Sequence, residues 1–174
     1  MRNSWAFRTP AWQYKKATRG CPCGYAGDAQ RQCKCAPPAV DRYQARLSGP
    51  MRDRFDLSVD VRAVPWRELR AATAGESSVL VRARVVAARD RQMQRAAQLN
   101  ARLDGAALKR ACRLDAAAER LLGAAMSRQL LSARAATRVL RVARTIADLA
   151  AREAIEAGDV AEALQFRGGA GRPE

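Results

Sequence analysis

The second half of the chain predicts helix almost without interruption, and this limits the possible fold more than any other feature. After Val64-Pro65 the predicted helices cover residues 76–100, 105–112, 115–129, 132–153 and 159–166. The residues expected to cap three of them are Asp115, Ser132 and Asp159. We therefore expect a mainly α protein whose C-terminal half is a helical bundle.

Only one segment has the pattern of a strand. Phe55–Val61 alternates apolar and polar residues, as a half-buried strand does. One strand does not make a sheet, so we interpret it as a residual strand from a larger α/β core. Asp53-Arg54-Phe55-Asp56 enters this strand, and Arg54 either pairs with the adjacent carboxylates or projects toward an anion on another molecule.

Residues 21–38 are rich in Cys, Gly and Pro and predict a loop. It carries two C-x-C pairs, Cys21/Cys23 and Cys33/Cys35. Four thiolates on one loop suit tetrahedral zinc, and the glycines let the loop fold back on itself. Because the spacing is not the usual C-x2-C, two interpretations remain open: a structural zinc site, or a metal-free loop that is reduced or disulfide-linked. Cys112 lies among Ala and Leu and is predicted to be a buried small residue.

The charge of the chain favours a polyanion as a partner. The sequence has 32 Lys+Arg against 17 Asp+Glu, a net charge of +15. An Arg- and Ala-rich composition is also typical of GC-rich genomes, so charge alone does not decide. At about 100° per residue, the helix after Ser132 separates two faces. Its apolar face holds Val139, Ala143, Ile146, Ala147 and Ala150, and its basic stripe holds Arg134, Arg138 and Arg141. The stripe either binds phosphate or is solvated surface.

Several classes of protein are excluded by what the sequence lacks. It has no histidine, which excludes Ser/His/Asp and Cys/His nucleophiles and histidine metal ligands. It has no G-x-x-x-x-G-K-[ST] and no apolar strand ending in paired acids, so we expect no P-loop hydrolysis by this chain alone. It also lacks a signal sequence and an apolar run of about 20 residues, so we expect no membrane helix and a cytoplasmic location.

Several strings together resemble a known family. CPCGYAGD, CKC, VDRYQARLSGPMRDRFDLSVDV, LNARLDGAAL and LSARAATRVLRVARTIADLA occur in the order found in the C-terminal part of magnesium-chelatase-like AAA+ ATPases of the ComM/YifB type. The resemblance covers about Cys21 to Arg167. It implies an ATP-driven hexameric ring that migrates branched DNA during natural transformation.

The resemblance also implies roles for individual residues. Arg54, in DRFD, matches an arginine finger that reaches the phosphate held by the adjacent subunit. Arg134, in Ser-Ala-Arg, matches the sensor 2 arginine, and Arg138 is the next candidate. A planar, permanently charged donor suits the charge that develops on the transferred phosphoryl group. For Arg134 the resemblance favours a functional role over solvated surface.

The expected organisation follows from the resemblance. Residues 1–20 are an unmatched basic leader, either disordered or an arm that stacks on bases. Residues 21–64 are the end of an AAA+ core with the Cys-rich loop, 65–167 the helical lid, and 168–174 a flexible tail. We expect a truncated AAA+ protein that uses ATP and Mg²⁺ only in a ring with full-length, P-loop-bearing subunits. The alternatives are a small basic DNA-binding module and a non-functional gene remnant.

Overall fold

A computed structural model of the chain describes residues 20–26, 28, 31–46, 55–59, 64–71, 75–128 and 131–168. Arg54, the predicted leader before Gly20 and the predicted tail after Gly168 lie outside these residues. The chain divides into two compact units, an N-terminal unit of residues 1–46 and a C-terminal unit of residues 47–174.

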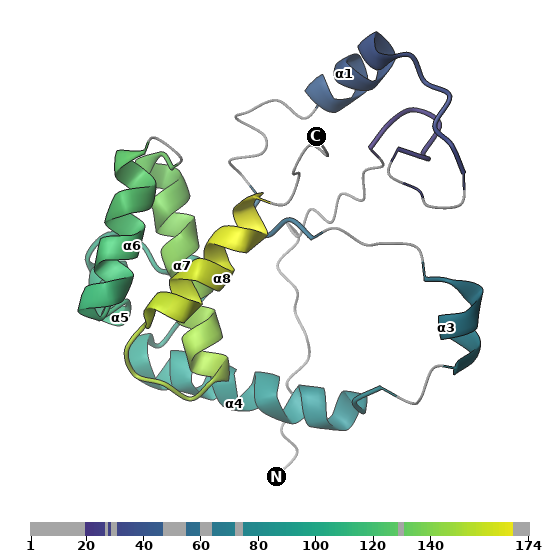
Figure 1. Ribbon diagram of the computed structural model, residues 1–174. Helices are drawn as coiled ribbons and strands as arrows, with labels where there is room; N and C mark the ends of the chain where they lie inside the picture. Colours follow the sequence, from purple (N-terminus) through teal and green to yellow (C-terminus); the bar gives the residue numbers. More distant parts are fainter. Residues whose placement is uncertain are drawn as a thin grey trace. The chain divides into compact units, whose positions relative to one another are not determined.

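The N-terminal unit consists of the Cys-rich loop and one helix, α1 (Pro37–Ala45) (Figure 1). Proline at the first helical positions favours helix initiation here, because its missing N–H has no intrahelical partner to lose. The side-chain amide of Gln44, near the end of α1, donates to the carbonyl oxygen of Gly20 at 3.1 Å. The helix is thus tied back to the start of the loop.

The C-terminal unit is helical in most of its described residues, as predicted. Its elements are α3 (Trp66–Ala71), α4 (Ser78–Ala96), the 3-10 helix η1 (Asn100–Arg102), α5 (Gly105–Ala111), α6 (Ala116–Ser127), α7 (Ala133–Leu149) and α8 (Ala157–Gly168). None of the helices within the described ranges combines the length and apolar character needed to cross a membrane.

Two of the predicted helix caps are confirmed and one is wrong. Asp115 accepts from the backbone N–H of Ala118 at 2.6 Å, and Ser132 accepts from Ala135 at 3.2 Å. Asp159 does not cap α8, because that helix begins two residues earlier. Its carboxylate instead accepts from the backbone N–H of Glu156 at 2.9 Å, so it reaches back from the first turn as the acid of a capping box does.

The core of the C-terminal unit surrounds α7, which packs against α4 and α8, while α6 packs against α8 (Figure 1). The buried side chains include Leu103, Ile155 and Val160 from the connections and α8. On α7, Val139, Ala143 and Ala147 are buried as predicted. Ile146 is only half-buried and Ala150 is exposed, because α7 ends at Leu149 and the chain turns away.

The predicted strand is absent from residues 55–59, the part of Phe55–Val61 that the structure describes. The backbone N–H of Ser58 donates to the carbonyl oxygen of Phe166 at 2.8 Å, so the segment lies against the end of α8. Leu57 and Val59 are 54% and 65% exposed, so the apolar side of the alternation is not buried. A strand needs a partner strand, and the described residues contain only one isolated bridge, Leu114 with Ile155.

Candidate functional site

The basic stripe on α7 lines a hollow of about 450 Å³ in the C-terminal unit. Its walls are Ala133, Arg134, Thr137, Arg138 and Arg141. The hollow lies at the first turns of α7, where the positive end of the helix dipole adds to the guanidinium charges. This arrangement can bind an anion.

Partners within the chain already hold two of these three arginines. Arg138 forms an ion pair with Asp56, a residue of the DRFD string. Arg141 donates through Nε to the carbonyl oxygen of Leu103 at 2.7 Å. Arg134 is exposed in the first turn of the helix. An anion in the hollow therefore meets Arg134 directly, and it must compete with the Asp56 carboxylate for Arg138.

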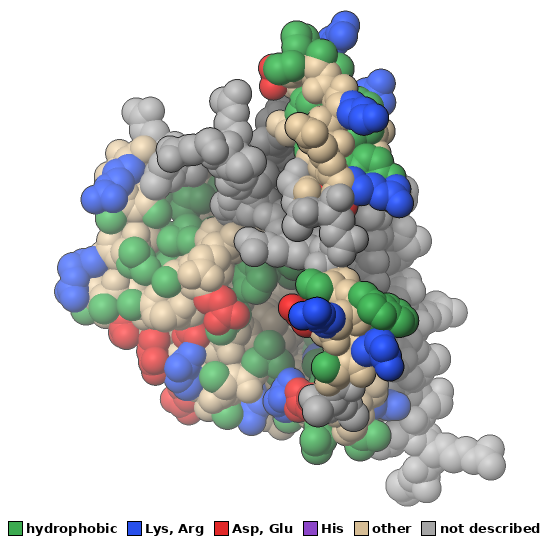
Figure 2. Space-filling model, turned by 45° about the vertical axis from the view of Figure 1, so that its right-hand side comes forward, with side chains coloured by type: hydrophobic (Ala, Val, Ile, Leu, Met, Phe, Trp, Pro, Cys, Tyr) green, Lys and Arg blue, Asp and Glu red, His purple; other side chains and the backbone are tan. Residues whose placement is uncertain are grey.

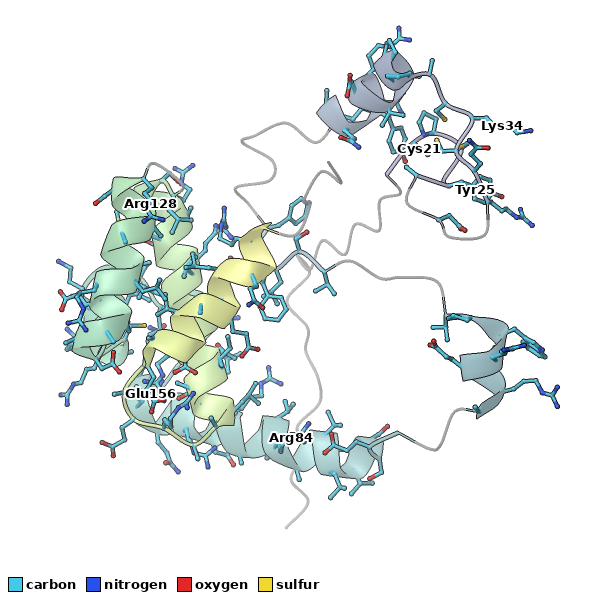
Figure 3. The ribbon with its side chains drawn as sticks, in the orientation of Figure 1. Cys21, Tyr25, Lys34, Arg84, Arg128 and Glu156 are labelled. Carbon is cyan, nitrogen blue, oxygen red and sulfur yellow. The ribbon has the colours of Figure 1, made fainter. Side chains whose placement is uncertain are left out.

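The four cysteines of the loop lie together in the N-terminal unit (Figure 3). All four Sγ atoms are within 4.8 Å of one another. The Sγ of Cys21 lies 3.3 Å from that of Cys23 and 3.5 Å from that of Cys33, and Cys23 and Cys33 are 3.6 Å apart. All are free thiols. Together Cys21, Cys23, Cys33 and Cys35 form a cluster that can hold a metal ion.

The backbone of the loop is folded around this cluster. The N–H of Ala26 donates to the Sγ of Cys21 at 3.2 Å, and the N–H of Gly24 donates to the carbonyl oxygen of Cys21 at 3.1 Å. Gly24 has a φ of 86°, which a residue with a side chain rarely adopts. The backbone N–H of Tyr25 lowers the pKa of the Cys23 thiol to about 6, so this sulfur ionises readily.

Cys112 is not part of the cysteine cluster. It is buried in the C-terminal unit, as predicted, and its Sγ contacts the carbonyl oxygen of Leu140 at 3.7 Å. Burial raises the pKa of this thiol to about 11. Cys112 is therefore a packed, protonated side chain rather than a ligand.

A second basic hollow, of about 550 Å³, lies between the Cys-rich loop and α1. It is lined by Pro22, Ala39, Arg42, Tyr43 and Arg46. The Arg46 guanidinium carbon lies 5.6 Å from the centre of the Tyr43 ring, a cation–π arrangement. This hollow was not predicted from the sequence. The two prolines that begin α1 are a signal for the start of a helix, and a helix here places these side chains on one face.

A buried polar network joins α4, η1 and α7, and it also was not predicted. Asp148 is fully buried and accepts from Asn100 at 2.8 Å and from Arg144 at 3.1 Å. Arg95 completes an ion pair with the same carboxylate. Arg144, equally buried, also donates to the carbonyl oxygens of Arg152 and Glu153. This network is structural, since it is enclosed by the core.

Comparison with known proteins identifies the family. A family model described as magnesium chelatase, subunit ChlI C-terminal, matches residues 75–167, more than half of the 174 residues. The chain belongs to the magnesium chelatase family. A second model, magnesium chelatase, subunit ChlI, matches residues 2–69 of this family member. That match includes residues 2–20, whereas the sequence strings that carry the resemblance begin at Cys21.

Relatives of this magnesium chelatase family member are of the YifB and ComM type. The chain is 41% identical to the uncharacterized protein YifB of Escherichia coli over 107 residues, which cover 60% of the chain and 21% of the relative. It is 39% identical to the competence protein ComM of Haemophilus influenzae over 106 residues, 60% of the chain and 20% of the relative. The matched region thus spans about a fifth of these relatives.

The predicted site residues of this family member fall into two groups, one in each unit. The four cysteines form the cluster in the N-terminal unit. Arg134 and Arg138 line the α7 hollow in the C-terminal unit. Arg54 lies outside the described residues, so its role as an arginine finger stays a prediction. Asp56 of the same string pairs with Arg138, and whether Arg54 pairs with the adjacent carboxylates likewise stays a prediction.

Proposed function

We propose that the chain acts as the helical lid region of a magnesium-chelatase-like AAA+ ATPase of the ComM/YifB type. In this role the α7 hollow recognises the phosphates of ATP that partner subunits bind through their P-loops with Mg²⁺. The observation that carries the proposal is the placement of Arg134, Arg138 and Arg141 around one hollow at the start of α7.

The chemistry of the hollow fits a polyphosphate. Guanidinium groups present paired N–H donors to phosphate oxygens and stay charged at all physiological pH values. Arg138 is held near the hollow by Asp56, whose side chain is 51% exposed. An exposed ion pair contributes only about 0–1 kcal/mol, so a multiply charged phosphate can displace the Asp56 carboxylate at little cost.

The surface of α4 supports contact with a full-length, P-loop-bearing subunit. Ala88 and Gln92 are buried against the bundle, and one and two turns before Ala88 the same helix face continues with Val85 and Val81, which are 42% and 38% exposed. In Figure 1 the N-terminal half of α4 extends beyond α7 and α8. An apolar stripe that continues past its own bundle suits contact with the ATPase core of a full-length subunit in a ring.

The Haemophilus relative is a competence protein, and this supports a role in DNA uptake for the assembled machine. We therefore extend the proposal to ATP-driven branch migration of DNA in a hexameric ring. The net charge of +15 suits such a partner, but on the helical bundle of the C-terminal unit Figure 2 shows Lys and Arg interspersed with Asp and Glu rather than gathered in one field. The proposed ligand of the α7 hollow is therefore the phosphate of ATP rather than DNA.

The purified chain alone is expected to release no phosphate from ATP above the buffer blank. Its sequence contains no G-x-x-x-x-G-K-[ST] to hold the β- and γ-phosphates and Mg²⁺, and the α7 arginines supply no such cradle. A phosphate-release assay with Mg²⁺ measures this. Turnover by the wild-type chain that disappears in an Arg54→Ala variant would show that the chain is an ATPase by itself and would overturn the partner-dependent role.

A second candidate function, binding of single-stranded DNA, is favoured by the hollow beside α1. Arg42 and Arg46 can contact phosphates while the Tyr43 ring offers a stacking surface for a base. This function would belong to a small basic binding module, with no need of ATP.

The DNA hypothesis predicts a change in salt dependence. Each phosphate contact to a single strand contributes about 0.7 to the slope of log affinity against log salt, so an Arg42→Ala, Arg46→Ala variant is expected to lower that slope by about 1.4. Fluorescence anisotropy with a labelled oligonucleotide at several salt concentrations measures it. An Arg120→Ala, Arg128→Ala variant removes the same charge from α6 and the residue that follows it, and it serves as the control. An unchanged slope, or tight binding insensitive to Cys33→Ser, would count against this surface.

A further inference from the structure

The described residues of the N-terminal unit form almost no hydrophobic core. Among its described residues only Cys21 is buried, and α1 has no buried residue at all. A segment this small cannot be held together by so little apolar burial, and natural proteins of such size use a metal or disulfides instead. Its compact fold therefore needs a cross-link at the place where the four thiols meet.

The geometry of the thiols favours a metal over disulfides. A disulfide needs two sulfurs about 2.05 Å apart, whereas the Sγ atoms of Cys21, Cys23 and Cys33 are separated by 3.3, 3.5 and 3.6 Å. Four sulfurs around one zinc, each at a Zn–S distance of about 2.3 Å, lie about 3.8 Å from one another. The cluster is therefore close to the size of a tetrahedral tetrathiolate site, and small shifts bring all four sulfurs to one ion.

The residues around the cluster suit a charged tetrathiolate. The N–H of Ala26 points at the Sγ of Cys21 from 3.2 Å, a contact that stabilises negative charge on a bound sulfur. The sequence supplies no histidine, and the carboxylates of the unit lie outside the cluster, so all ligands are soft sulfur atoms. Soft thiolates in a tetrahedral set select zinc rather than Mg²⁺ or Ca²⁺.

We propose that Cys21, Cys23, Cys33 and Cys35 bind one zinc ion in a closed, structural site that forms the core of the N-terminal unit. Binding deprotonates the thiols, and their protons pass to solvent. Four protein ligands fill the tetrahedral shell and leave no position for substrate, so the ion is structural. Since Cys35 directly precedes the cap of α1 and Gln44 ties the end of α1 to Gly20, the ion also fixes this helix. The proposal does not depend on phosphate binding by α7.

The metal content of the purified full-length chain tests the site. The wild-type chain, produced with zinc and without chelators, is expected to carry one zinc ion, measured by mass spectrometry of the elements. Replacement by Co²⁺ should give the visible absorption bands of a tetrahedral cobalt thiolate. A Cys33→Ser variant should bind zinc more than about 100-fold more weakly. Mutation of a residue that only hydrogen-bonds to a metal ligand already lowers metal affinity by about 10–100-fold, and Cys33 is itself a ligand.

The fifth cysteine provides the matched control. A Cys112→Ser variant should keep one zinc ion and the same cobalt spectrum, because Cys112 is buried in the core of the C-terminal unit and is not a member of the cluster. Removal of zinc by a chelator should collapse the amide NMR signals of residues 20–46 and leave those of Leu103 and Ile155 in place. A wild-type chain without zinc and without cobalt bands, a chain that carries iron instead, or a Cys33→Ser variant that still holds zinc at wild-type affinity would overturn the proposal.

Discussion

An Asp148→Ala variant is expected to lose about 3–5 kcal/mol of the free energy of unfolding, because it removes the only carboxylate of the buried network and leaves the fully buried Arg144 without its ion-pair partner. Domains of this size are stable by about 5–15 kcal/mol. The melting temperature of the C-terminal unit should fall by roughly 10–30 °C, as measured by far-UV circular dichroism. In the least stable case the helical signal is already lost at room temperature.

Two further variants separate the network from a general loss of charge. Asp90 is an exposed residue of α4, and Asp90→Ala should change stability by no more than about 0.5 kcal/mol. Asp148→Asn keeps the shape and one hydrogen-bond acceptor, so it should fall between Asp148→Ala and the wild type. If the Asp148→Ala variant has the same melting temperature as the Asp90→Ala variant, the buried network does not hold α4, η1 and α7 together.

An Arg134→Ala, Arg138→Ala double variant is expected to bind tripolyphosphate at least about tenfold more weakly than the wild type, a loss of about 1.4 kcal/mol. Both side chains line the α7 hollow, and hydrogen bonds to charged groups are the strongest contacts that such a surface can offer. Calorimetry at low ionic strength measures the affinity, because salt screens exposed charges.

The control for this variant must remove the same charge elsewhere. Arg120 and Arg128 are exposed on or directly after α6, and their double replacement by alanine also lowers the net charge by two. It should leave tripolyphosphate affinity nearly unchanged. Loss of the Arg138–Asp56 pair should cost at most about 1 kcal/mol of stability, so the binding variant should remain folded. Equal weakening in both variants would mean that the chain attracts polyanions only through its overall charge.

The helices could be predicted because their signals are local. Capping by Asp115 and Ser132 and the spacing of Val139, Ala143 and Ala147 depend on residues within one helix, and the structure has them as predicted. The prediction of a strand at Phe55–Val61 was wrong for residues 55–59, because the alternation of apolar and polar residues says nothing about which segment they pack against. The partner here is the end of α8, more than a hundred residues away in sequence, as the contact from Arg167 to Phe55 shows.

The candidate sites were predictable to different degrees for the same reason. The cysteine cluster and the α7 stripe follow from spacing, and the structure brings their members together. The burial of Arg144 and Asp148 could not be predicted, because an Arg and an Asp four residues apart usually form an exposed pair on a helix. Here Arg95 and Asn100, about fifty residues earlier, complete the network and make burial possible.

An NMR titration of the isotope-labelled wild-type chain with ATP, and separately with adenosine, tests the proposed phosphate site most directly. We predict saturable shifts of the backbone amides of residues 133–138 and of the side-chain Nε signals of Arg134 and Arg138 with ATP. Adenosine, which carries no phosphate, should leave them in place, and the Nε signal of Arg120 should not move with either ligand. Shifts that are absent from α7, or that spread equally over the exposed arginines, would contradict the account.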